Sequence, residues 1–178
     1  MKHLIRYLSA FILFILILLN FTHLIYLNIY THSLPQGIYF RIKGSPKVGD
    51  FAATCLTEPI ARYGIERNYL AQGHCPTGTV YVLKVIVGLP GDRFDVKDGF
   101  FRINKHSYRI MTNDSIQRPL KLFYRQKEGI IDKANYILLS DHVRNSWDSR
   151  YWGPVSIEFL LKPLWLIENV RKFQISHP

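Results

Sequence analysis

The chain has 178 residues, which leaves room for one ordinary domain and a short additional segment rather than two catalytic domains. Its formal net charge of +10 and pI of about 9.7 first suggest nucleic-acid binding. The basic residues are scattered singly, however, and no basic helix or zinc-finger spacing accompanies them. We therefore expect no nucleic-acid partner.

An almost continuous apolar run occupies residues 8–27. About 20 apolar residues can cross a bilayer core, so the run predicts a transmembrane anchor over residues 7–27, preceded by a short segment, residues 1–6. The alternative is a cleaved signal peptide, whose apolar part is shorter and ends in a small-residue site. No such site follows Leu19. In an anchored protein, attraction to anionic lipid headgroups also explains the basic excess.

Immediately after this run, the stretch THSLPQGIYF brings a serine, a proline and a glycine close together. Pro35 and Gly37 favour a sharp turn, which would hold Ser33 ahead of a strand beginning near Gly37. Taken alone, a serine in front of such a turn is usually only a local hydrogen-bonding residue.

Short apolar or alternating segments bounded by turn residues follow, a pattern typical of an all-β domain with hairpins. The predicted strands are residues 37–42, 50–56, 80–87, 93–96, 100–103, 108–111, 136–139 and 161–167. One helical segment is predicted over residues 59–72, because Thr57 can cap it and Pro59 is tolerated in a first turn. The polar-rich region 113–133 matches no element.

Cys55 and Cys75, the two cysteines of the chain, flank this helical segment. A pair in an exported domain usually forms a disulfide, whereas a cytosolic pair stays reduced. We predict a Cys55–Cys75 disulfide that pins the helical insertion to its strand, with two buried free thiols as the alternative. Because basic residues lie on both sides of the apolar run, this pair indicates an exported domain better than charge does.

Lys84 interrupts an otherwise apolar strand, residues 80–87. Both faces of that strand are predicted to be buried. Burial disfavours the charged ammonium and lowers its pKa, and a neutral amine near pH 7 is a general base. An edge-strand lysine that reaches to water is the alternative. Paired with Ser33, a buried Lys84 forms a candidate Ser/Lys dyad, a known variant of the serine peptidase triad.

Three blocks together resemble the type I signal peptidases, in order and at suitable distances. They are Ser33 with its turn, the run KVIVGLPGD from Lys84, and the run SDHVRNSWDSRYWGPV over residues 140–155. The resemblance covers roughly residues 28–168. It implies a mainly β fold, a signal-peptidase-like β-sheet catalytic domain with a small helical, disulfide-pinned insertion and one N-terminal transmembrane helix.

Within this family, the chain is most similar to the conjugative-transfer branch, the TraF-type peptidases. That branch has a serine block of the form Ser-x-Pro-x-Gly-x-Tyr, as in Ser33 to Tyr39. General leader peptidases carry Ser-Met-x-Pro instead, and Gly-Asp-Asn where this chain has Ser140, Asp141 and His142. Further similarities are Gly73-x-Cys75-Pro76, residues 118–120 (Arg-Pro-Leu) and residues 163–165 (Pro-Leu-Trp).

The resemblance implies roles for single residues. Ser33 would be the nucleophile, Lys84 its general base, and Ser146 the hydroxyl that orients the lysine. The oxyanion would be bound by the Ser33 backbone N–H and the Thr31 hydroxyl. The alternative for Thr31 is a threonine that merely ends the membrane helix.

Asp148 and Arg150 are expected to form a structural ion pair that braces the loop behind the dyad. No metal or cofactor is expected.

We therefore expect a membrane-anchored serine endopeptidase that cleaves leader peptides from exported precursors, with residues 28–178 on the periplasmic side of a bacterial inner membrane. The branch implies pilin-like substrates, and in some members the pilin's ends are joined into a ring. The alternatives are a general type I signal peptidase and a non-catalytic β-domain that scaffolds a conjugation channel. A self-cleaving DNA-bound repressor is disfavoured by the anchor and the missing DNA-binding helices.

Overall fold

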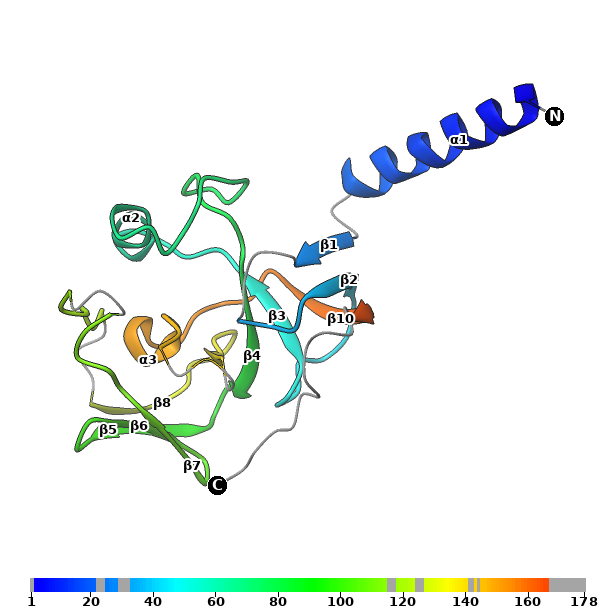
Figure 1. Cartoon of the computed structure of the whole chain (residues 1–178). Coiled ribbons are helices and arrows are strands. Elements are labelled where there is room, and N and C mark those ends of the chain that lie inside the picture. Colours follow the sequence, from blue (N-terminus) through cyan, green and yellow to red (C-terminus); the bar gives the residue numbers. More distant parts are fainter. Residues whose placement is uncertain are drawn as a thin grey trace.

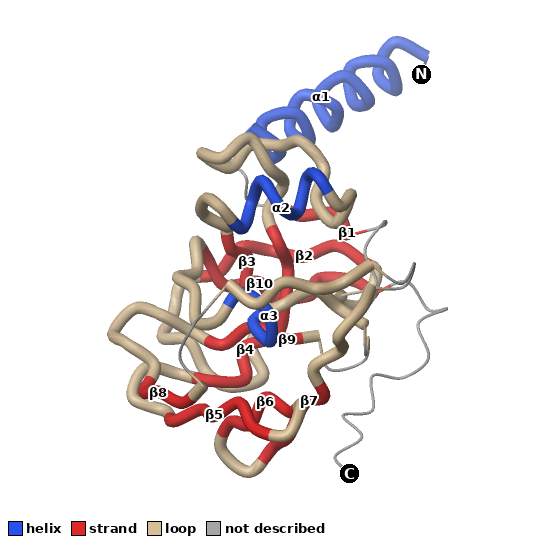
Figure 2. The backbone as a smooth tube through the Cα atoms, turned by 90° about the vertical axis from the view of Figure 1, so that its left-hand side faces the viewer, coloured by secondary structure: helices blue, strands red, loops and turns tan. Residues whose placement is uncertain are grey.

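The computed structural model describes residues 2–21, 25–28, 33–114, 118–123, 127–140, 143 and 145–166. Helix α1 (Lys2–Phe21) projects away from the rest of the chain in both views (Figures 1 and 2), and its apolar side chains between Leu4 and Leu18 are exposed. Within the described residues, no helix is both long enough and apolar enough to cross a bilayer.

The larger sheet is antiparallel and carries the strand order β1-β2-β10-β3-β4-β9. Its strands are β1 (Ile25–Asn28), β2 (Gly37–Ile42), β3 (Phe51–Thr54), β4 (Val82–Gly88), β9 (Ile137–Leu139) and β10 (Phe159–Leu166). Strand β4 lies between β3 and β9, and nearly all of its side chains are buried. The apolar character of its sequence is explained by this position, since both faces of the strand are covered.

The smaller sheet has the order β7-β6-β5-β8 and lies at the end of the molecule opposite α1 (Figure 2). Its strands are β5 (Arg93–Lys97), β6 (Phe100–Ile103), β7 (His106–Arg109) and β8 (Glu128–Ile130). Asp98 and Gly99 have positive φ angles at the turn between β5 and β6, as the sequence predicts for a tight hairpin.

The two sheets meet at Gly88, the last residue of β4. A side chain there would clash with Ile103 and Ile131, which belong to the core beneath the smaller sheet. Only glycine therefore allows this close approach.

The predicted mainly β fold is confirmed, and so is the Cys55–Cys75 disulfide. The disulfide closes a segment that contains helix α2 (Ile60–Glu66), which is shorter than the predicted helix over residues 59–72. Elements that the sequence did not predict are β1, β8 and the short helix α3 (Ser149–Trp152).

The end of the predicted anchor, residue 27, is wrong. Residues 25–28 form strand β1 and pair with β2. The physical reason is the side chain of Tyr26, which packs against the rings of Tyr81 and Phe159 in the core of the β domain. In the sequence, Tyr26 continues the apolar run and is therefore assigned to the membrane helix, although its ring packs against other aromatic rings of the β domain.

Candidate active site

Three predicted residues from distant parts of the chain converge on one point. The Nζ atom of Lys84 lies 2.6 Å from Oγ of Ser33 and 2.7 Å from Oγ of Ser146. Both distances are within hydrogen-bonding range. The lysine stands on β4, Ser33 lies in the turn before β2, and Ser146 lies just before α3.

Lys84 is buried, with 3% of the residue exposed. Burial lowers its pKa from the ordinary value of 10.5 to about 8; the Asp148 carboxylate opposes this effect, and the Arg150 guanidinium adds to it. With a pKa near 8, about a tenth of the amine is neutral at pH 7, whereas an ordinary lysine is almost fully charged. The site can therefore supply a base at neutral pH.

The turn that carries Ser33 is fixed by the residue that follows it. Leu34 is 1% exposed and packs in a core cluster with Tyr39, Ala53 and Val85. Val85 is the neighbour of Lys84 on β4, and Leu34 is the neighbour of Ser33. Ser33 and Lys84 are therefore both adjacent to residues of the same core cluster.

Asp148 and Arg150 form a buried pair behind Ser146. Two guanidinium nitrogens of Arg150 each lie 2.8 Å from an Asp148 carboxylate oxygen, a bidentate arrangement. Arg150 Nη2 also donates to the Ser146 carbonyl, 3.1 Å away. Asp148 additionally caps α3 by accepting from the Arg150 backbone N–H, and it accepts from the backbone N–H of Ser140. This geometry braces the segment that presents Ser146.

A cavity of about 260 Å³ opens beside the dyad. Its lining includes Ser33, Lys84 and Ser146, together with Leu83 of β4. A cavity that contains both a hydroxyl and a neutral base is the arrangement expected of a nucleophilic catalyst.

The outer wall of this cavity comes from two segments that sequence reasoning missed. Tyr69, inside the disulfide-closed segment, donates its hydroxyl to Asp114 at 2.6 Å, and Arg118 Nε lies 2.7 Å from the same carboxylate oxygen. Tyr69, Asp114 and Leu120 all line the cavity. The Arg-Pro-Leu run of residues 118–120 was the signal that could have pointed to this wall.

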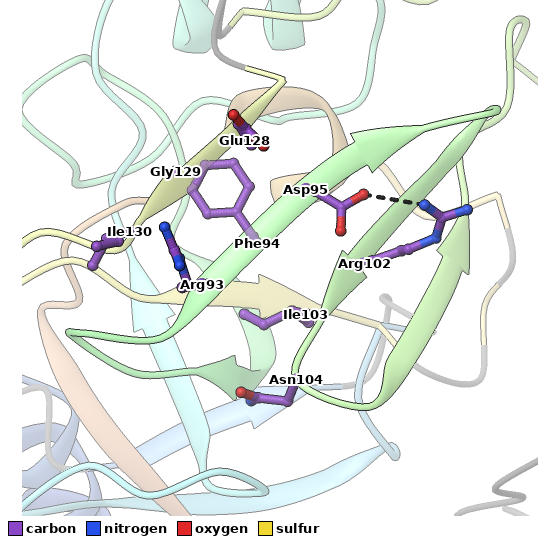
Figure 3. A pocket seen from close by; sticks show the side chains of 9 residues that line it. All are labelled: Arg93, Phe94, Asp95, Arg102, Ile103, Asn104, Glu128, Gly129 and Ile130. Atoms are coloured by element: carbon purple, nitrogen blue, oxygen red, sulfur yellow. Dashed lines mark hydrogen bonds and ion pairs between the residues drawn. The ribbon is translucent and has the colours of Figure 1, made fainter.

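A larger cavity, of about 570 Å³, lies on the smaller sheet (Figure 3). Its ionisable lining includes Asp95 and Arg102, which are ion-paired at 3.2 Å, and also Arg93 and Glu128. The lining residues described there include no serine or cysteine beside a base. We therefore assign the candidate site to the smaller cavity, because its chemistry, and not its size, fits catalysis.

Four residues of the expected site region lie outside the described residues. They are Thr31, the expected oxyanion donor, and Asp141, His142 and Arg144 of the third block.

Known proteins similar to this chain include signal peptidases and conjugal transfer proteins. A family model described as signal peptidase, peptidase S26, matches residues 1–161. A plasmid transfer protein TraF of Escherichia coli is 30% identical over 131 residues, which cover 71% of this chain and 73% of that protein. A probable conjugal transfer protein TraF of Sinorhizobium fredii is also 30% identical over 131 residues, covering 70% and 67% of the two chains.

Among solved structures, a signal peptidase I from Enterococcus faecalis V583 aligns with a TM-score of 0.38 and 21% sequence identity. The alignment covers 67% of this chain and 98% of that chain.

Proposed function

Because the chain belongs to the peptidase S26 family of signal peptidases, we propose that it is a serine endopeptidase that uses Ser33 and Lys84 to cleave leader peptides from exported precursors. The observation that carries this proposal is the 2.6 Å distance between Lys84 Nζ and Ser33 Oγ. The supporting electrostatics are those of a buried amine with a lowered pKa.

The proposed reaction has two stages. The neutral Lys84 amine accepts the hydroxyl proton of Ser33 while Oγ attacks the scissile carbonyl carbon. The resulting ammonium then donates a proton to the departing amine, which leaves an ester on Ser33. In the second stage Lys84 accepts a proton from water while the water oxygen attacks the ester carbonyl carbon. The Lys84 ammonium then donates that proton to Oγ of Ser33 as the ester bond breaks, and the product leaves as a carboxylic acid that ionises in solution.

Supporting residues hold this machinery in place. Ser146 keeps the lysine amine near Ser33, and the Asp148–Arg150 pair holds the backbone at Ser146. The proposed oxyanion donors are the backbone N–H of Ser33 and the hydroxyl of Thr31.

The substrate is proposed to bind as an extended strand beside the start of β4. Strand β9 pairs with Val85, Ile86 and Gly88, so in the described pairing the first residues of β4 have β3 on one side only. The cavity lies along this stretch, with Leu83 and Lys84 in its lining. Addition of a strand there would use backbone hydrogen bonds for affinity and the cavity for specificity.

The substrate class is proposed from the relatives. Since TraF proteins of plasmid and conjugal transfer align with about 70% of this chain, we assign pilin-like precursors or other conjugative-transfer components to it as proposed substrates. The ester on Ser33 also allows an alternative outcome, in which a peptide amine attacks instead of water and joins the pilin's ends.

The proposal includes a location at the bacterial inner membrane, with the β domain on the periplasmic side. The proposed anchor is the apolar run that begins at residue 7, whose side chains are exposed along helix α1. Ser33 follows the end of α1 by 12 positions in the chain, so the nucleophile would lie close to the lipid surface, where the cleavage site of a membrane-inserted leader emerges. Anionic headgroups would attract the basic surface.

The test is cleavage of a pilin precursor by the purified full-length protein in detergent, followed by mass spectrometry of the products. Ser33→Ala and Lys84→Ala are each expected to abolish cleavage without loss of the fold. Ser45→Ala and Lys43→Ala are matched controls at exposed positions and should retain full activity. Cleavage at the normal rate by either dyad variant would disprove the proposed catalytic pair and favour a non-catalytic scaffold.

A further inference from the structure

The turn that carries Ser33 is held through its backbone carbonyl groups. Buried carbonyls need hydrogen-bond donors, and three consecutive ones here receive them from side chains of three different segments. The acceptors are the carbonyls of residues 33, 34 and 35. We call this set of hydrogen bonds to the carbonyls of residues 33–35 the cradle. It restricts the backbone of the turn more tightly than the packing of one side chain in the core does.

Asn28, at the end of β1, supplies the central donors of this cradle. Its Nδ2 atom donates to the carbonyl of Leu34 at 3.0 Å and to the carbonyl of Pro35 at 3.1 Å. An amide nitrogen carries two hydrogens, so both are used on the turn. Asn28 is 2% exposed, and it sits opposite Gly37 in the register of β1 and β2.

Two other buried hydroxyls complete the cradle. The Tyr39 hydroxyl of β2 donates to the Pro35 carbonyl at 2.5 Å, and the Ser140 hydroxyl after β9 donates to the carbonyl of Ser33 itself at 3.1 Å. The Pro35 carbonyl thus accepts from both Asn28 and Tyr39.

We propose that Asn28, supported by Tyr39, is a positioning residue for the nucleophile: its amide fixes the backbone of residues 34 and 35 and so holds the Ser33 hydroxyl within proton-transfer distance of Lys84. The inference rests on the proposed function. Asn28 is not among the described residues that line the cavity, and its amide nitrogen donates to the turn, so the proposed role is exerted through the turn.

The physical reason is the steep dependence of the reaction on geometry. A displacement of about 1 Å can reduce a rate about 100-fold. Ser33 Oγ lies 2.6 Å from Lys84 Nζ, so such a displacement would take the two atoms out of hydrogen-bonding distance. An aspartate in place of Asn28 would put carboxylate oxygens against two carbonyl oxygens and push the turn away. An alanine would leave both carbonyls without these donors.

The experiment measures kcat, KM and the pH–rate profile of the full-length protein in detergent with Asn28→Ala, Asn28→Asp and Tyr39→Phe. For the Asn28 variants we expect kcat to fall about 10- to 100-fold with KM changed less than about threefold. Tyr39→Phe should lower kcat in the same way but less, because Asn28 still binds the Pro35 carbonyl. The apparent pKa of the profile should stay close to that of wild type or fall slightly. Burial, the main cause of the lowered pKa of Lys84, is unchanged, whereas a displaced Ser33 hydroxyl no longer accepts from the ammonium.

A control variant and a labelling experiment test whether the loss of kcat comes from the position of Ser33. Leu27→Ala changes the neighbouring exposed residue of β1 and should leave kcat unaltered. The rate at which a serine-directed phosphonylating probe labels Ser33 should fall in parallel with kcat in the Asn28 variants. All rates are normalised to the folded fraction from thermal unfolding. If the Asn28 variants fail to fold, Tyr39→Phe decides the question by the same criteria.

Wild-type kcat in the folded fraction, or a loss confined to KM or to thermal stability, would overturn the inference. The proposed function fails separately: if Ser33→Ala still cleaves, the dyad is wrong whatever Asn28 does. If Ser33→Ala is inactive and Asn28→Asp is fully active, only the positioning role is wrong.

Discussion

Burial of Lys84 has two consequences, a cost in stability and a lowered pKa that suits the proposed role as a base. Its ammonium loses hydration in the core, and the same loss lowers its pKa to about 8. The neighbouring Ser33 and Ser146 hydroxyls are neutral groups, so they satisfy the amine without the full stabilisation that a carboxylate partner would give its charge.

The first residue-scale prediction concerns the pH dependence of cleavage. Since the base must be neutral, kcat/KM should rise with pH up to about 8 and level off above it. Ser146→Ala removes an acceptor of the ammonium, so it should move the profile to lower pH and reduce the plateau about 10- to 100-fold through misorientation of the lysine. Initial rates between pH 6 and 10 provide the measurement. A profile that does not change between pH 7 and 9 would contradict the assignment of Lys84 as base.

A second prediction at this scale concerns stability. The folded-state pKa of Lys84 lies below the unfolded one, so between pH about 8 and 10.5 the unfolded chain binds more protons, and the free energy of unfolding should rise with pH. The gain over that window is about 3 kcal/mol. Lys84→Met should abolish this rise and be more stable than wild type at pH 7. Urea unfolding of both proteins at pH 7, 8, 9 and 10 measures the free energy of unfolding. If it changed with pH equally in wild type and Lys84→Met, the rise could not be attributed to Lys84.

The sequence pointed to Ser33 and Lys84 because their chemistry is unusual locally, and the structure brings the two side chains within hydrogen-bonding distance. A lysine in the apolar strand around Lys84 and a serine before the Pro35 turn are visible without a structure. Asn28 and Tyr69 were not predicted, because their partners are backbone carbonyls or residues far away in the chain. A hydrogen bond across many residues leaves no spacing pattern to read.

At the scale of elements, helix α3 is held by a buried ion pair together with hydrogen bonds to its cap and to β9. Asp148 caps the helix, pairs with Arg150 and is fully buried, while Ser149 of the same helix accepts from the Leu138 backbone N–H of β9. The four-residue helix is thereby attached to the larger sheet, and Ser146 lies just before it.

This attachment gives the element-scale prediction. Asp148→Ala leaves the buried Arg150 charge unpaired, so it should lower the free energy of unfolding by about 3–5 kcal/mol. The double variant Asp148→Ala/Arg150→Met removes both charges and should recover part of that loss. Chemical denaturation of the three proteins makes the comparison. A double variant less stable than the single one would show that the Arg150 charge has other essential partners.

Strand prediction succeeded where alternation or apolar runs were bounded by turns, as for β4 and β6. It failed for β1, because only Thr22 and His23 separate the apolar residues around Ile25 from the apolar run of α1. Strand β8 has three residues and α3 has four. Segments this short show neither the two-residue alternation of a strand nor the 3.6-residue period of a helix. Helix α2 ends at Glu66, before the predicted residue 72, and the turn that follows places Asn68 at a positive φ.

For the molecule as a whole, fold class followed from the pattern of strands, whereas sheet order did not. The placement of β10 between β2 and β3 pairs residues more than 100 positions apart, and the sequence holds no local record of that pairing. The family resemblance, in contrast, came from three short blocks, and the match over residues 1–161 confirms it.

The whole-molecule prediction concerns location. If α1 anchors the chain, the protein should sediment with membranes and resist extraction by alkaline carbonate. Protease added to spheroplasts should digest the β domain, because that domain would face outward. A cytoplasmic protein with a similar anchor in the opposite orientation is the control. Recovery in the soluble fraction, or protection in intact spheroplasts, would contradict the proposed topology.

Gly88 connects the smaller sheet to the strand that carries Lys84, because its lack of a side chain lets the two sheets meet. Gly88 and Lys84 share β4 and lie roughly 13 Å apart along the strand. A methyl group at position 88 would clash with Ile103 and Ile131. Relief of that clash would shift β4 and so displace the side-chain amine of Lys84. Substitutions at Gly88 are therefore expected to lower the proposed activity although this residue does not line the candidate site.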